Sequence, residues 1–175
     1  MIKTSLCSLE TALLYKNDNV LHKFRESYAV SMAEARDIFT ETGRWLWLCA
    51  YTQSLKESER ARVAPPLLVV SEEILILDEM WHTFILFTKE YTDYCLEHFG
   101  HYIHHAPTTH AIKVSMGKQM KAAPAAFMRK RRAGMEKQYG YIYDVLGEET
   151  LLKWYREYPA RYSLAKMTAL FRSVN

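Results

Sequence analysis

An aspartate and a histidine stand four residues apart, as Asp78 and His82, within the most hydrophobic stretch of the chain. On a helix this spacing places both side chains on one face, one turn from each other. Because the surrounding residues are apolar on almost every side, we expect His82 to lie in the core and the pair to be partly desolvated. A buried charge must be paired or must bind a metal ion. The pair therefore predicts either two ligands of one ion or an aspartate that orients the histidine ring through a hydrogen bond, and the spacing favours neither.

Five more histidines follow within thirteen residues, beyond the predicted end of the same helix. They are His98, His101, His104, His105 and His110. Gly100 lets the chain turn sharply, so the following loop can fold back along its own helix and bring one or two imidazoles toward His82. Two imidazoles and a carboxylate with open positions suit Zn, Fe(II) or Mn(II). Glu73, Glu90 or Tyr91 could add a further ligand.

The same residues have a structural interpretation without metal. Asp78 and His82 can be an ordinary structural pair that bonds to each other where two helices cross. The later histidines can be solvated, or can bind the last carbonyls of their helix, where a cation is favoured. In that case the protein is a non-catalytic interaction module. With a metal, and as an enzyme, it would activate water or dioxygen at an open coordination position.

A longer pattern runs through this region. It reads Asp78-x-x-Trp81-His82, then Thr88, Tyr91, Cys95, Phe99-Gly100 and His104-His105-x-Pro107. This pattern resembles the block shared by glycine-rich domain-containing-like proteins, and the resemblance covers residues 67–110, including the Pro-Pro-Leu that precedes it. Plant members carry a glycine-rich tail that this sequence lacks, so the resemblance is to a short form.

The resemblance implies one packed unit but no reaction. It favours His104 or His105 as the partner of His82, which makes Asp78, His82, His104 and His105 the candidate metal ligands. It also implies that Trp81, Tyr91, Cys95 and Pro107 support them by packing or hydrogen bonding. Cys95 as a nucleophile would need a base nearby, and a cysteine in an apolar helix is more often inert.

The densest basic run in the sequence is Arg129-Lys130-Arg131-Arg132. Lys118, Lys121 and Lys137 extend it, and three tyrosines follow at 139, 141 and 143. A basic face with aromatic neighbours can bind an acidic protein, RNA or single-stranded DNA. Four consecutive residues of a helix point in different directions, however, so a solvated face is the alternative.

The composition predicts a soluble, cytoplasmic protein. The three cysteines, Cys7, Cys49 and Cys95, are too few and too scattered for a disulfide framework, and free thiols fit a reducing compartment. The first 18 residues lack the apolar core of a signal peptide. The most hydrophobic window, residues 67–87, holds four acidic residues and a histidine, which a membrane span rarely tolerates.

Helical spacing dominates the elements that must position these residues. With 175 residues, 49% of them hydrophobic, the chain suits one domain over residues 1–175. We predict an all-α, single compact domain of five or six helices, with a histidine-rich loop after the third main helix. The expected helices are 18–29, 32–59, 71–98, 122–146, 148–158 and 164–171, with a loop at 100–117. Ser31 and Glu34 form a predicted capping box, and Pro159 is expected to end the fifth helix.

Overall fold

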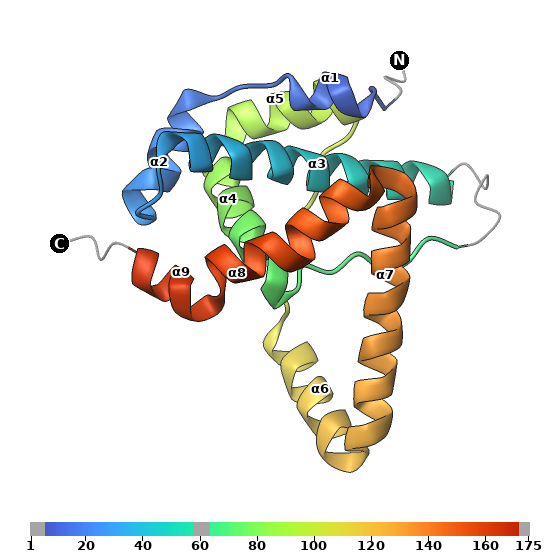
Figure 1. Ribbon diagram of the computed structural model, residues 1–175. Helices are drawn as coiled ribbons and strands as arrows, with labels where there is room; N and C mark the ends of the chain where they lie inside the picture. The colour runs from blue at the N-terminus through green and yellow to red at the C-terminus, as the bar shows by residue number, and fades with distance from the viewer. Residues whose placement is uncertain (1–5, 58–63, 172–175) are drawn as a thin grey trace.

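The computed structural model describes residues 6–57 and 64–171, and these residues form an all-α fold (Figure 1). The α-helices are α1 (Leu9–Leu13), α2 (Asp18–Ser27), α3 (Met32–Glu57), α4 (Leu75–Leu86), α5 (Thr88–Phe99), α6 (His110–Ala122), α7 (Pro124–Leu152), α8 (Tyr158–Tyr162) and α9 (Leu164–Leu170). A 3₁₀ turn, η1 (Glu72–Ile74), precedes α4, and a π-helical turn, η2 (Lys153–Glu157), connects α7 to α8. The predicted all-α class is confirmed, although the helical segments outnumber the expected five or six.

Most helix starts follow the local sequence. Ser31 Oγ accepts the Glu34 N–H at 3.2 Å and Glu34 Oε2 accepts the Ser31 N–H at 2.9 Å, which confirms the capping box at the start of α3. Asn17 caps α2 by accepting the Val20 N–H at 3.2 Å. The predicted C-terminal end of α3, at residues 58–59, lies outside the described residues.

The single helix predicted at 71–98 is wrong in one respect, because it is divided into η1, α4 and α5. The division between α4 and α5 falls at Phe87, whose φ of −87° and ψ of 66° are not helical. The expected stop at Gly100 is confirmed, since this glycine adopts a left-handed φ of 76° and its N–H bonds to Leu96 O at 3.1 Å.

Two further expectations need correction. The predicted loop at 100–117 is shorter, because Thr109 caps α6 by accepting the Ile112 N–H at 3.3 Å and the helix begins at His110. Pro159 does not end its helix but stands in the first turn of α8, where a missing N–H costs little. Gly147, with φ of 85°, breaks the long α7 as the sequence predicted, and Figure 1 shows the sharp corner there.

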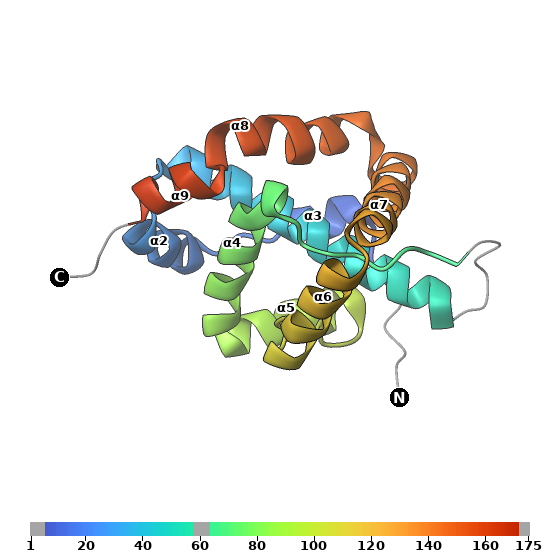
Figure 2. The same ribbon diagram turned by 90° about the horizontal axis from the view of Figure 1, so that it is seen from below.

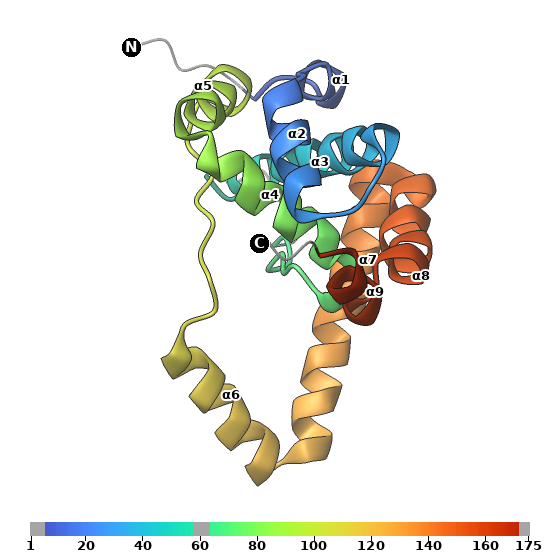
Figure 3. The ribbon, with the colours of Figure 1, turned by 90° about the vertical axis from the view of Figure 1, so that its left-hand side faces the viewer.

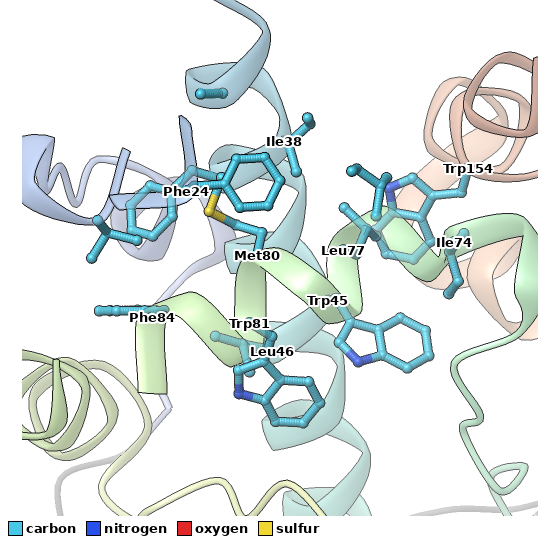
Figure 4. Close-up of a cluster of buried hydrophobic side chains, with 14 of the residues drawn as sticks. Phe24, Ile38, Trp45, Leu46, Ile74, Leu77, Met80, Trp81, Phe84 and Trp154 are labelled. Carbon is cyan, nitrogen blue, oxygen red and sulfur yellow. The ribbon is translucent and has the colours of Figure 1, made fainter. Parts of the chain in front are cut away.

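The helices pack around α3. Figures 1 and 2 show α5 and α8 on opposite sides of α3, while Figure 3 shows α6 and the first half of α7 extending away from the other helices. Many buried side chains of the core come from α2, α3, η1, α4 and η2 (Figure 4), among them Phe24, Ile38, Trp45, Leu46, Ile74, Leu77, Met80, Phe84 and Trp154. One face of α4 is thus packed against the core.

A buried carboxylate ties α3 to η2. Glu41 is 4% exposed, and its Oε2 accepts the indole N–H of Trp154 at 2.8 Å. Lys153 and Arg44 form ion pairs with the same carboxylate at 3.2 Å each. Because every charged group here has a partner, the burial of Glu41 is tolerated.

Candidate metal centre

Three ligand-bearing side chains converge where the connection after α5 returns to α4. Asp78 Oδ1 accepts a hydrogen bond from His105 Nε2 at 2.8 Å, and Asp78 Oδ2 lies 3.8 Å from His82 Nδ1. The two imidazole centroids are 4.4 Å apart. One ligand atom from each of the three residues lies within 4.8 Å of the others, so the group could hold a metal ion.

The centre lies at the surface, which corrects the expectation that His82 is a core residue. The side chain of His82 is 49% exposed, whereas those of Asp78 and His105 are 17% and 14% exposed. The opposite face of α4 carries the core residues Leu77 and Met80. Two candidate ligands, Asp78 and His105, are therefore largely buried, and they lie beside the more accessible imidazole of His82.

A chain of contacts positions His105. The ring of Trp81 meets the His105 ring edge-on, with centroids 4.3 Å apart and planes at 70°. The Trp81 indole N–H donates to Tyr91 Oη at 2.9 Å, and the Tyr91 hydroxyl donates to the carbonyl of Ile103 at 2.7 Å. This chain connects α4, α5 and the backbone two residues before His105, so it fixes the path by which the imidazole reaches Asp78.

Tyr91 and Cys95 support the centre from the core. Both are fully buried, and burial raises the pKa of the Tyr91 hydroxyl and of the Cys95 thiol. A raised pKa keeps the hydroxyl protonated and able to donate to Ile103. It also keeps the thiol protonated, which argues against Cys95 as a nucleophile.

The remaining histidines of the predicted cluster lie elsewhere. His104 is exposed and packs against Tyr102, with ring centroids 4.9 Å apart, and it is not part of the metal-capable group. His98 Nδ1 bonds to Tyr94 O and His101 Nδ1 to Phe99 O, each at 3.0 Å. His110 begins α6. Within the described residues, Glu73 and Glu90 likewise stand outside the group, and the Tyr91 hydroxyl bonds to Trp81 and Ile103 instead.

Replacing Tyr91 with phenylalanine is expected to destabilise the protein by about 1–3 kcal/mol, because the change leaves the Trp81 N–H and the Ile103 carbonyl without their buried partner. Urea unfolding measures this loss. Tyr102→Phe is the matched control, since its ring contacts Tyr91 but its hydroxyl makes no hydrogen bond within the described chain. Equal stability of the two variants would contradict the positioning role of Tyr91.

The basic run lies apart from this centre. Arg129, Lys130, Arg131 and Arg132 are all exposed on the first half of α7, and Arg132 pairs with Glu136 at 3.0 Å. Two of the following tyrosines serve packing: Tyr139 contacts Tyr155, and Tyr141 bonds to Thr52 at 3.1 Å. No sequence pattern predicted the open groove that lies here, lined by α6, α7 and the extended segment at residues 64–71.

Comparison with known proteins gives one match. The family model described as UCP032817-like matches residues 51–123, a segment that includes Asp78, His82 and His105. No curated protein and no solved structure matches the chain. Within residues 6–57 and 64–171, no helix is both long enough and apolar enough to span a membrane. The chain is thus similar, over the segment that builds the centre, to the UCP032817-like family.

Proposed function

We propose that the protein binds one divalent transition-metal ion through Asp78, His82 and His105. The observation that carries this proposal is the convergence of a carboxylate and two imidazoles, one of them 27 positions along the chain from Asp78. Two imidazoles and one carboxylate suit Zn, Fe(II) or Mn(II). His104, a candidate ligand by sequence, is left out of this proposal because its ring packs against Tyr102.

The spacing of the ligand atoms supports an ion of this size. Metal–ligand bonds of about 2.0–2.2 Å in a tetrahedral site separate neighbouring ligand atoms by about 3.3–3.6 Å. The separations of 2.8 and 3.8 Å join different oxygens of Asp78 to the two imidazoles, and one ligand atom from each of the three residues lies within 4.8 Å of the others, so the side chains would move closer together to hold one ion. An incoming ion would replace the proton between Asp78 and His105.

A purely structural tie accounts for less of the geometry. The hydrogen bond between Asp78 and His105 alone would hold the connection against α4. This hydrogen bond does not require a third polar side chain. His82 nevertheless lies beside the same carboxylate, with about half of its side chain exposed to solvent. A metal centre uses all three groups and gives the accessible imidazole a role.

Three protein ligands leave at least one coordination position for water or substrate. Such sites are typical of catalytic rather than structural metal centres. The reaction classes that this arrangement supports are metal-assisted hydrolysis and, with Fe(II), activation of dioxygen. The exposed side of His82 supports access from solvent.

We also infer that the chain is a relative of the glycine-rich domain-containing-like proteins. The block from Asp78 to Pro107 supports this relation, since its Trp81, Tyr91 and His105 lie in one connected group. The free thiols of Cys7, Cys49 and Cys95 support a reducing compartment such as the cytoplasm.

Metal titration of chelator-treated protein by calorimetry tests the proposal, with Zn²⁺, Mn²⁺ and, without oxygen, Fe²⁺. We expect one equivalent to bind, and His82→Ala to weaken binding by about 10-fold or more, by analogy with the loss of outer-shell partners. His104→Ala is the matched control, because it removes a neighbouring exposed imidazole outside the group. Failure of all three ions to bind, or equal loss in both variants, would refute the centre.

A further inference from the structure

Helix α6 and the first half of α7, residues 110–137, form an arm that has few packing partners among the described residues. No residue of α6 is buried, yet Ile112, Met116 and Met120 recur every four positions and form one exposed apolar stripe. Figures 1 and 3 show α6 and α7 diverging from the turn at Ala123. An amphipathic helix with an uncovered apolar face indicates a surface that another molecule covers.

A groove of about 1130 Å³ lies between this arm and the extended segment at residues 64–71. Its apolar lining includes Leu67, Val69, Met116, Phe127, Met135 and Tyr141. Sites for small molecules usually occupy about 300–1000 Å³, so this groove is larger than a small ligand requires.

The floor of the groove is already formed. The Gln138 side chain accepts the Val69 N–H at 2.8 Å and donates to the Val69 carbonyl at 2.9 Å. Gln138 also donates to the Tyr155 hydroxyl at 2.8 Å, which connects the floor to η2. Since the backbone groups of Val69 are satisfied, they are not free to pair with an added β-strand, and the groove offers side-chain contacts instead.

The arm is strongly basic compared with the rest of the chain. Residues 110–137 hold eight Lys and Arg side chains against one acidic side chain, Glu136, which gives a formal net charge of +7. The whole chain carries +3, which leaves −4 for the remainder. Lys130, Arg131 and Lys137 line the groove itself. Two acidic residues also line the groove: Glu72 on η1, and Asp144, about two turns beyond Lys137 on α7.

We propose that this groove, lined by α6, α7 and residues 64–71, binds an amphipathic helix of a partner protein whose flanks are acidic. An apolar floor beside basic side chains matches a helix with one apolar face and carboxylates on either side. The methionines Met116 and Met135 can adapt to the apolar side chains of such a helix. The added helix would complete a three-helix arrangement with α6 and α7.

Two other anionic partners fit the groove less well. Nucleic acid could stack bases on the lining aromatics Phe127 and Tyr141, but the rest of the apolar lining (Leu67, Val69, Met116 and Met135) offers no stacking surface. A bilayer is flat on the scale of the arm, so it cannot reach apolar side chains inside a groove.

Fluorescence anisotropy with the full chain tests this proposal. The probes are an 18-residue labelled Leu/Glu amphipathic helix, the same peptide with Lys in place of Glu, a 20-nucleotide single-stranded DNA, and phosphatidylserine vesicles. We expect the Glu peptide to bind at least 10-fold more tightly than the Lys peptide. Equal binding of the two peptides, or tighter binding of DNA or vesicles than of the Glu peptide, would overturn the proposal.

Matched variants separate the groove from the charge of the arm. Met116→Glu places a carboxylate on the groove lining, and Met128→Glu makes the same change at an exposed position outside the lining. Both lower the net charge of the arm equally. We expect the first to weaken binding of the Glu peptide by 10-fold or more and the second by less than threefold. Equal losses would mean that charge alone attracts the peptide, which contradicts a groove site.

Discussion

Replacing Asp78 with asparagine is expected to weaken divalent-metal binding by about 100-fold or more, since loss of outer-shell partners alone costs 10–100-fold in metal centres. Asp78 is the only anionic ligand of the proposed set, and its two oxygens face the two imidazoles separately. An amide keeps the size of the side chain but loses the charge and one of the two acceptor oxygens. The fold should lose only about 1–2 kcal/mol, because an amide can still hydrogen-bond to His105.

Thermal unfolding with and without metal checks this expectation. A ligand that binds only the folded state at 100 times its Kd adds about 2.7 kcal/mol to the free energy of unfolding. At a Zn²⁺ concentration of 100 times its Kd, the wild-type protein should therefore gain about 2.7 kcal/mol, whereas Asp78→Asn should gain no more than about 0.4 kcal/mol. Asp93→Asn, an equal change at an exposed carboxylate of α5 that pairs with Lys89, is the control. A metal-induced shift that survives in Asp78→Asn would remove Asp78 from the centre.

The helical part of the candidate site could be predicted from short-range sequence patterns. The i, i+4 spacing placed Asp78 and His82 on one face, and Gly100 marked the turn that lets the chain return. The choice of His105 over His104 could not be predicted, because it depends on the hydrogen bond from Tyr91 to the Ile103 carbonyl. That contact spans 12 positions and joins α5 to the segment that follows it, and no local periodicity encodes it.

The exposure of His82 illustrates a second limit. Apolar neighbours on both sides suggested that α4 is buried all round, but the core covers only one face of it. Leu86, an apolar residue one turn beyond His82, is 69% exposed. Residue type alone does not decide which face of a helix meets the core, since much of a protein surface is apolar.

The predicted helix boundaries were wrong where neither glycine nor proline marks the end of a helix. The break at Phe87 has neither glycine nor proline, so helical spacing appeared continuous across α4 and α5. Helix α6 buries no residue, and its apolar stripe has only three members, Ile112, Met116 and Met120, among Lys, Ser, Gln and Gly. The capping threonine at 109 was a usable signal, and it outweighs the irregular spacing that follows it.

Replacing Trp154 with alanine is expected to cost about 3–5 kcal/mol of folding free energy, the usual range for removing a large aromatic side chain from a core. Trp154 is fully buried, meets Trp45 with ring centroids 5.7 Å apart, and donates its N–H to the buried Glu41. The variant leaves a large cavity and a carboxylate with fewer donors. For a protein of this length, each 1 kcal/mol lowers Tm by about 2–4 °C, so we expect a drop of roughly 6–20 °C.

Two further variants are compared with Trp154→Ala. Trp154→Phe keeps most of the ring but removes the donor to Glu41, so its loss should lie between those of the wild type and Trp154→Ala. Tyr143→Ala, at a 52% exposed position, should change stability by no more than about 0.5 kcal/mol. If Trp154→Ala were as stable as Tyr143→Ala, η2 would not be packed on α3 as described. The Glu41 carboxylate would then face solvent, because Lys153 and Arg44 alone do not explain its burial.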